Sequence, residues 1–312
     1  MKKIKFAILL LFVVSLFSCV TDPLKDIEEG NWNNERSVIN IKLENQVGKA
    51  TIERIDDQTG TIVLAINVDA VPDLSSIKLS SIQLSYGAES SVKVGESFNF
   101  ENASKTATMT VTSPTGMTRE YTITATSFKE TILGTYKITN LVVYGGTGPE
   151  YGGASVMAMT SKSWLWAATD GPQAELDNSL TFTLSGIDDD GNTYGKVVNN
   201  AGADGLYANF IYIKDPVTDV NNHYRKIPTG EGEWSRNYTT ATISFTFADG
   251  KTTTCTYIGA GVEDMGNKKS KTTTDNAFRF TLNGTDDWGK IYSDYDKFVK
   301  RPRVLWVDVT KQ

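Results

Sequence analysis

The sequence predicts an all-β protein with two domains, and three observations support this prediction. Apolar and polar residues alternate with a period of two in many short segments, as expected for strands with one buried face. No segment longer than about ten residues carries the i, i+3, i+4 apolar spacing of an amphipathic helix. The chain is also long enough, at 312 residues, for two domains.

The first 18 residues are predicted to be a signal peptide and not part of the fold. Lysines at positions 2, 3 and 5 precede an apolar run over residues 6–17, which suits a signal peptide and falls short of the ~20 residues that span a bilayer. The run ends in Leu16-Phe17-Ser18-Cys19, which resembles the lipobox of bacterial lipoproteins. The resemblance implies cleavage before Cys19 and acylation of this cysteine, and several acyl chains give a stable anchor. The alternative is an ordinary secretory signal followed by an incidental cysteine.

Residues 19–35 are predicted to form a flexible tether, because they are polar and acidic and contain Pro23 and Gly30. Acidic residues just after the lipidated cysteine resemble the export signal of surface lipoproteins in Bacteroidetes. This resemblance implies a lipid-anchored protein of the outer membrane that faces the cell surface.

The composition argues against several classes of function. The formal net charge is −6, and it becomes −9 when the three lysines of the signal peptide are removed, so we expect no nucleic-acid partner. Cys255 has no partner for a disulfide once Cys19 carries lipid. His223 is the only histidine, which leaves too few ligands for a thiolate/imidazole zinc site and no recognisable catalytic triad. We therefore expect no catalytic residues, no metal and no cofactor.

Residues 36–128 are predicted to form an immunoglobulin-like β-sandwich. The segment from Val71 to Ser75 is expected to bridge its two sheets, because Pro72 has no N–H for a central strand. Strands are expected over residues 39–43, 50–55, 61–68, 81–86, 107–112 and 119–125, with turn-forming residues between them.

Several short patterns in this region carry a family resemblance. They are Ile39-x-Ile41-x-Leu43, Thr61-Ile-Val63, Val71-Pro-Asp-Leu-Ser75, Gly87-Ala88, Phe98-Asn-Phe100 and Arg119-Glu-Tyr121-Thr-Ile123. Together they resemble the cadherin-like sandwich domains that follow the lipid anchor in outer-membrane lipoproteins of Bacteroidetes. The resemblance implies a spacer that presents the rest of the chain and has no catalytic residues.

Residues 132–312 are predicted to form a larger antiparallel β domain, either a lipocalin-like barrel or a jelly-roll sandwich. Short strands joined by hairpins open with Gly134-Thr-Tyr136 and include Gly232-Glu-Trp234. This succession resembles the lipocalin-like meander of Bacteroidetes proteins. Either fold would present a concave face or a mouth to a ligand.

One hairpin of this domain has a predictable register. A three-residue loop over residues 248–250, with Gly250 in the left-handed region, pairs Ile243 with Cys255 and Ala241 with Tyr257. This register keeps the apolar residues on one face, whereas a two-residue loop would divide them. Cys255 is then a small buried hydrophobic residue that does not react.

A second hairpin is expected around the acidic turn at residues 188–192. Asp188, Asp190 and Asn192 match the first ligand positions of an EF-hand loop, but Thr193 replaces its glycine and Asn199 replaces its glutamate. An ordinary solvated turn is the preferred interpretation, because aspartate, asparagine and glycine are common in turns.

Aromatic residues of the second domain are the candidate ligand-binding residues. Trp164 and Trp166 are two positions apart, so on a strand both rings would point to the same side and form a platform for a sugar ring. The glycine-rich segment that contains Tyr144 and Tyr151 is interpreted as too flexible for a core, and Trp234 completes the candidate set. The alternative is that both tryptophans belong to the core. Further aromatic residues in or beside polar segments are Tyr207, Tyr212, Trp288, Tyr292 and Tyr295.

These observations predict a surface lipoprotein of a polysaccharide-utilisation system. It would bind a polysaccharide or oligosaccharide through the aromatic residues, attach to the bilayer through acylated Cys19, and work with other outer-membrane uptake proteins. One alternative is an adhesion or envelope-assembly lipoprotein with a protein partner. A less favoured alternative is a glycoside hydrolase, for which no catalytic motif is recognisable. Its available carboxylates would be Asp170, Glu175, Asp204, Glu231 and Glu233.

Overall fold

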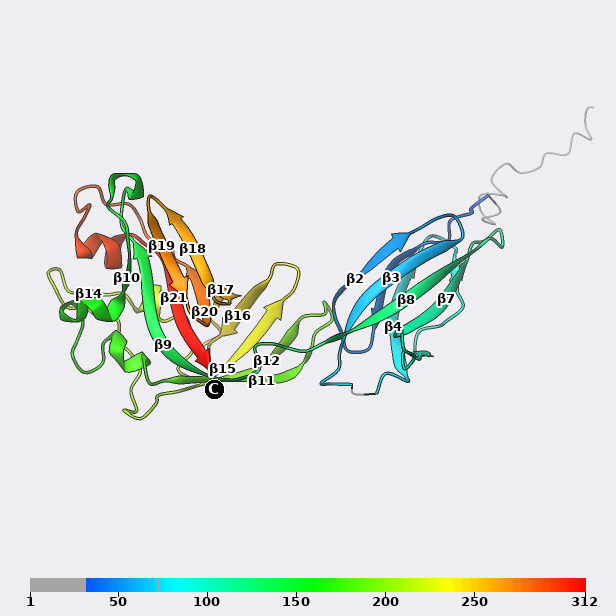
Figure 1. Cartoon of the computed structure of the whole chain (residues 1–312), viewed down its shortest axis with the longest axis horizontal. Coiled ribbons are helices and arrows are strands. Elements are labelled where there is room, and N and C mark those ends of the chain that lie inside the picture. The colour runs from blue at the N-terminus through cyan, green and yellow to red at the C-terminus, as the bar shows by residue number, and fades with distance from the viewer. Residues whose placement is uncertain (1–31, 72) are drawn as a thin grey trace, which may run out of the picture. The chain divides into compact units, whose positions relative to one another are not determined.

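The computed structural model describes residues 32–71 and 73–312. The predicted signal peptide (1–18), the lipidation site Cys19 and most of the predicted tether lie outside the described residues. The described residues divide into two compact units, one that ends at Ser127 and one that begins at Phe128, and both are built mainly from β-strands (Figure 1). None of the helices in the described ranges is long and apolar enough to cross a membrane.

The first unit is a sandwich of two antiparallel sheets. A three-stranded sheet has the order β1-β4-β6, and a five-stranded sheet has the order β2-β3-β8-β7-β5. Inward-facing side chains of both sheets, such as Ile41, Leu79, Leu64 and Tyr121, form one core. The strands are β1 (Val38–Leu43), β2 (Gln46–Arg54), β3 (Thr59–Asn67), β4 (Ile77–Leu84), β5 (Glu89–Ser90), β6 (Ser97–Phe98), β7 (Thr106–Thr112) and β8 (Thr118–Phe128).

Strand β1 departs from the predicted alternation. Ile39, expected on the buried face with Ile41 and Leu43, is 56% exposed. The register with β4 shifts between Val38 and Asn40, and such a bulge changes the face to which the neighbouring side chain points. Val38 takes the buried position in place of Ile39.

The connection after β3 links the two sheets, as predicted. It runs from β3 of the five-stranded sheet to β4 of the three-stranded sheet. Leu74 in this connection is buried in the core, and its carbonyl accepts a hydrogen bond from the N–H of Phe100 at 2.9 Å.

The second unit contains a closed barrel of eight antiparallel strands, so the barrel alternative is correct and the jelly roll is not. The strands pair in chain order, and β21 pairs with β9 to close the barrel. This order is an up-and-down meander. The strands are β9 (Gly134–Gly145), β11 (Ser179–Ile187), β12 (Thr193–Asn200), β15 (Gly230–Asn237), β16 (Thr242–Thr246), β17 (Thr252–Ile258), β20 (Asn276–Thr281) and β21 (Pro302–Lys311).

The β16–β17 hairpin has the predicted loop. Ile243 pairs with Cys255, and Gly250 has a φ of 82°, as a three-residue loop with a left-handed glycine requires. The predicted pair of Ala241 and Tyr257 does not form. Ala241 precedes β16 with a φ of 55°, and Tyr257 pairs with β20 instead.

The acidic turn between β11 and β12 is closed by its own hydrogen bonds. The carboxylate of Asp188 accepts the backbone N–H groups of Asp190 at 2.9 Å and Asn192 at 2.8 Å. It also accepts the side-chain amide of Asn192 at 3.1 Å. Within residues 32–71 and 73–312, no group of three or more His, Cys, Asp or Glu side chains could hold a metal ion. The aspartate at position 188 therefore has a structural role in the turn.

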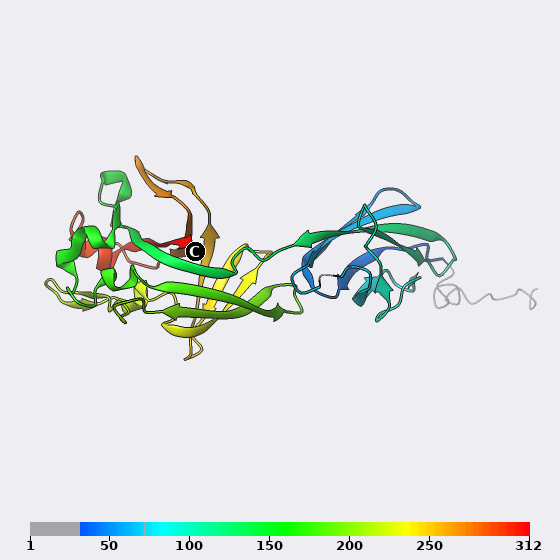
Figure 2. The ribbon, with the colours of Figure 1, turned by 60° about the horizontal axis from the view of Figure 1, so that its bottom comes forward.

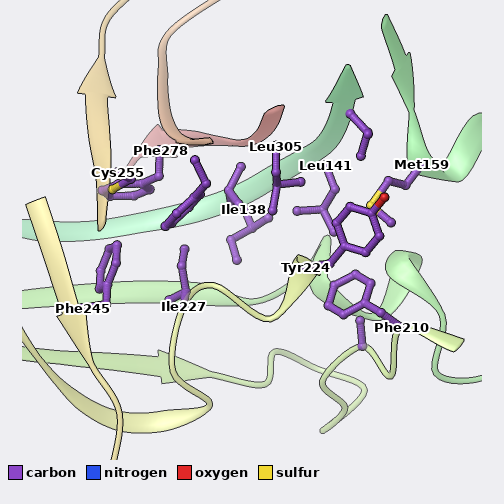
Figure 3. Close-up of a cluster of buried hydrophobic side chains, with 14 of the residues drawn as sticks. Ile138, Leu141, Met159, Phe210, Tyr224, Ile227, Phe245, Cys255, Phe278 and Leu305 are labelled. Carbon is purple, nitrogen blue, oxygen red and sulfur yellow. The ribbon is translucent and has the colours of Figure 1, made fainter. Parts of the chain in front are cut away.

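Side chains fill the interior of the barrel. Figure 3 shows part of this packed cluster, in which Ile138, Phe245 and Leu305 from the barrel wall lie with Tyr224 of the segment between β12 and β15. The cavity beside Ile138 and Tyr224 has a volume of about 20 Å³, which is far below the ~300 Å³ of a small ligand site. A glycan therefore does not fit into this part of the interior.

The long segment between β12 and β15 packs against the core of the barrel. Phe210 and Tyr224 of this segment belong to the core. Arg225 forms an ion pair with the buried carboxylate of Glu175 at 2.6 Å, and Glu175 also accepts the N–H of Ala208 at 2.9 Å. Glu175, one of the carboxylates considered for a hydrolase, is thus used to hold this segment in place.

A separate hairpin, which is not part of the barrel wall, consists of β18 (Gly261–Gly266) and β19 (Lys269–Thr273) and lies against the outside of the barrel. It appears in orange in Figure 2. Glu263 accepts the indole N–H of Trp306 at 3.0 Å, and Lys271 forms an ion pair with Asp308 at 3.0 Å. The hairpin therefore covers outward-facing residues of β21.

Candidate functional site

The structure does not bring the five predicted ligand-binding aromatic residues together. Trp166, Trp234 and Tyr144 are buried, with at most 5% of each residue exposed. Trp164 and Tyr151 are exposed. Only these last two can present a ring to a ligand.

The predicted platform of Trp164 and Trp166 is wrong. Both were expected on a strand, but residues Met159–Leu165 form the 3₁₀ helix η3 and Trp166 caps its C-terminus. Residues two apart on a helix do not share a face. The indole N–H of Trp166 donates to the carbonyl of Met159 at 3.2 Å, and its ring meets three core aromatic rings edge-on. Trp166 is therefore a core residue, whereas Trp164 points to solvent.

Trp234 and Tyr144 also have packing roles. Trp234 lies on β15, and its indole N–H donates to the carbonyl of Thr183 at 3.0 Å. Tyr144 lies on β9 in a small buried cluster that includes Trp306. Burial raises the pKa of the Tyr144 phenol above its ordinary value. Neither side chain is available to a glycan in this structure.

The glycine-rich loop after β9 is packed and does not have the flexible character expected from its sequence. Residues 145–148 are all buried. A Cβ atom on Gly145 would lie 2.0 Å from the carbonyl oxygen of Lys297, and one on Gly153 would lie 1.9 Å from that of Thr147. Glycine is required at both positions because another backbone passes too close for any side chain.

A buried carboxylate attaches this loop to the segment between β20 and β21. Asp296 accepts the backbone N–H of Thr147 at 2.6 Å and the Thr147 hydroxyl at 2.8 Å. The same hydroxyl accepts the backbone N–H of Asp287 at 2.7 Å. Asp296 and Thr147 are both completely buried. Three hydrogen bonds therefore connect two loops that are far apart in the sequence.

Three exposed aromatic residues lie on the two connected loops, and we call them the loop-end aromatic cluster. They are Tyr151, Trp288 and Tyr292, with exposed fractions of 65%, 57% and 58%. The ring centroids of Tyr151 and Trp288 are 5.9 Å apart, with an angle of 67° between the ring planes. The hydroxyl of Tyr292 donates to the backbone carbonyl of Tyr151 at 3.3 Å. The cluster is therefore a single surface feature built from both loops.

The backbone of Tyr292 is strained. Its φ is 76°, a left-handed conformation that is an outlier for a bulky side chain and costs about 1–3 kcal/mol. The Lys297 ammonium group donates to the Tyr292 carbonyl at 3.0 Å and helps to hold this conformation. Strain of this kind concentrates at binding sites, where the surrounding structure maintains it.

Trp164 is tied to the same segment by a lysine. The ammonium group of Lys162 lies 5.1 Å from the centre of the Trp164 ring and 3.3 Å from the carboxylate of Asp294. Helix η3 is thus connected to the segment that carries Trp288 and Tyr292. Polar side chains on these loops that could bind sugar hydroxyls include Glu150, Asp287, Lys290 and Asp294.

Trp288 and Tyr292 were not in the predicted site. The segment around Trp288 reads Asn283-Gly-Thr-Asp-Asp-Trp288-Gly. This composition is too polar and glycine-rich for a strand of the core, and it is the sequence signal that could have indicated an exposed Trp288. An aromatic residue in such a segment is an expected surface feature. The sequence alone did not show that this segment meets Tyr151.

Comparisons with known proteins provide no family for this chain. No family model and no curated protein matches it. Among solved structures, it is similar to a crystal structure described as a "putative secreted protein" from Bacteroides fragilis, with 15% sequence identity and a TM-score of 0.23. The similarity covers 31% of this chain and 98% of that chain.

Proposed function

We propose that this protein binds glycan chains at the bacterial cell surface through the loop-end aromatic cluster. The observation that carries the proposal is the group of three exposed rings, Tyr151, Trp288 and Tyr292, on two loops that Asp296 holds together. The C–H groups on one face of a pyranose ring pack well on an aromatic face, and the neighbouring carboxylates and ammonium groups can bind its hydroxyls. Clustered exposed aromatic residues indicate a binding surface.

The fixed loops favour binding by this surface. Ordering a mobile side chain on binding costs about 0.5–1.5 kcal/mol. The Tyr292 hydroxyl bonds to the backbone of Tyr151, and the Trp288 ring packs against Gly148. Because the unbound protein already fixes these rings, less free energy is lost when a glycan binds.

The rest of the chain fits a protein that presents a binding domain. In this proposal, acylated Cys19 attaches the chain to the outer membrane, and the sandwich acts as a spacer. The barrel then holds the aromatic cluster toward glycans outside the cell. This arrangement suits a lipoprotein of a polysaccharide-utilisation system that works with outer-membrane uptake proteins.

Affinity electrophoresis of the full chain in gels that contain different polysaccharides would test the proposal. At least one polysaccharide should retard the protein, and Trp288→Ala should abolish that retardation while the thermal unfolding temperature stays the same. Tyr194→Ala is the matched control, because Tyr194 is an exposed aromatic residue of the barrel outside the cluster. If polysaccharides retard Trp288→Ala and Tyr151→Ala as strongly as the native chain, the loop-end aromatic cluster is not the binding site.

A protein partner is the second candidate, and the same cluster is the observation that favours it. Tyrosine and tryptophan are also enriched at the centres of protein–protein interfaces. An adhesion or envelope-assembly partner would be captured from envelope extracts by the native chain and not by Trp288→Ala. Glycan binding by the isolated protein, with no captured partner, would count against this alternative.

A further inference from the structure

The angle between two rings of the loop-end aromatic cluster restricts the shape of its ligand. The planes of Tyr151 and Trp288 form an angle of 67°, and their centroids are 5.9 Å apart. The two rings therefore meet edge to face and form a corner. A shared flat platform would need nearly parallel rings.

A flat glycan ribbon does not match this corner. In an extended β-1,4-linked chain, successive sugar residues present their faces in one plane. Two rings that stack on neighbouring residues of such a chain must then be nearly parallel. With Tyr151 and Trp288 at 67°, only one of the two rings could stack on a ribbon, and the other would meet its edge.

The surrounding residues hold the indole of Trp288 and the backbone of Tyr151 in place. Two carbon atoms of the Trp288 ring lie 3.1 and 3.2 Å from the position that a Cβ atom of Gly148 would occupy, so the indole lies directly against the Gly148 backbone. Tyr151 ends the short 3₁₀ helix η2 (Pro149–Tyr151), and its carbonyl accepts the Tyr292 hydroxyl. Gly148 itself is buried. Rotating the indole into the plane of the Tyr151 ring would disrupt its packing against Gly148.

We infer that the ligand is a bent or helical glycan chain, such as an α-1,4- or β-1,3-linked glucan. This inference rests on the proposed function and makes it more specific. Successive residues of such a chain are rotated relative to one another, so their faces point in different directions. One residue stacks on Trp288 and a neighbouring residue stacks on Tyr151. Both rings then contribute to the binding of one chain.

Isothermal titration calorimetry of the full chain with glycans of matched length would test this inference. At least one α-1,4- or β-1,3-linked glucan oligosaccharide should bind about tenfold more tightly than the β-1,4-linked glucan and mannan oligosaccharides. A tenfold difference in affinity corresponds to about 1.4 kcal/mol of binding free energy. Tyr151→Ala and Trp288→Ala should each weaken binding of that bent chain by a similar factor. Tyr151→Phe should retain the affinity, because the ring makes the contact, and Tyr194→Ala is the unaffected control.

Each contrary result has a distinct meaning. Binding of the β-1,4-linked chains as tightly as the bent chains would overturn the inference and leave the proposed glycan function intact. A monosaccharide that binds as tightly as the oligosaccharide would also overturn it, because a single sugar residue would then account for the contact. If the protein binds no glycan in the calorimeter or in polysaccharide gels, both the inference and the proposed function are wrong.

Discussion

The carboxylate of Asp296 holds Thr147 by two hydrogen bonds, one from the backbone N–H at 2.6 Å and one from the hydroxyl at 2.8 Å. The two residues are 149 positions apart, and each lies in a loop that carries part of the aromatic cluster. Because both groups are buried, no water can replace a lost partner easily. This contact therefore sets the positions of Tyr151 and Trp288 relative to each other.

Asp296→Ala is expected to lower the stability of the protein. The substitution leaves the buried N–H of Thr147 without an acceptor, which should lower the free energy of unfolding by about 1–3 kcal/mol. Urea denaturation measures this change. Asp294→Asn is the control, because Asp294 is only partly buried and forms a single ion pair with Lys162, so its loss should cost less than about 1 kcal/mol. Equal effects of the two substitutions would contradict the role given to Asp296.

Gly153→Ala should be much more damaging than Gly152→Ala, although the two positions are adjacent. A Cβ atom on Gly153 would lie 1.9 Å from the Thr147 carbonyl oxygen, so the loop must move, and such overpacking costs about 1–3 kcal/mol or more. Gly152 has a φ of 81°, and a Cβ atom on it would have no neighbouring atom within 4 Å. Alanine at this position therefore costs only about 1 kcal/mol of backbone strain. Thermal unfolding of both variants tests this difference. A similar loss for both would show that the loop is loosely packed.

Trp166→Ala and Trp164→Ala should separate core packing from surface exposure. Trp166 is buried and contacts three core aromatic rings, so its removal should lower the free energy of unfolding by about 3–5 kcal/mol. Trp164 is 55% exposed, and its removal should change the free energy of unfolding by about 0.5 kcal/mol. Chemical denaturation of the two variants provides the measurement. A large loss for Trp164→Ala would contradict its position on the surface.

Features that depend on residues close together in the sequence could be predicted. The loop of the β16–β17 hairpin follows from Asp249 and Gly250 and from the need to keep apolar residues on one face, so the pairing of Ile243 with Cys255 was predictable. The closure of the barrel was not, because it depends on pairing between β9 and β21 at opposite ends of the unit. A jelly roll has the same local rhythm of strands.

The candidate site could be predicted only in part for the same reason. Tyr151 was in the predicted set, but its neighbours Trp288 and Tyr292 come from a segment that is brought close by the contact of Asp296 with Thr147. The error at Trp164 and Trp166 has a different origin. Two tryptophans at a spacing of two suggest a strand, yet the segment is a 3₁₀ helix whose last turn directs one ring inward. Periodicity over so few residues does not distinguish the two structures.

The Cys255 thiol should resist modification in the folded protein. It is 4% exposed, and burial raises its pKa well above the ordinary value, so almost no thiolate is present at neutral pH. In a Cys19→Ser variant, where Cys255 is the only thiol, a disulfide reagent should react slowly under native conditions and rapidly in urea. If Cys255 reacts as fast in the folded protein as in the unfolded protein, this face of the barrel opens readily.

His223→Gln should reduce the loss of stability in mild acid. Burial lowers the pKa of His223 below its ordinary value of 6.5, and the nearby charge of Lys226 lowers it further. The unfolded chain therefore binds this proton more readily than the folded chain. The stability that neutral His223 contributes is complete above pH 6.5 and decreases as the pH falls through 6.5 toward the lower pKa of the folded state. Urea denaturation at about pH 7.5 and about pH 5.5 should show a larger decrease for the native sequence than for the variant. Equal decreases would mean that His223 titrates as freely in the folded protein as in the unfolded chain.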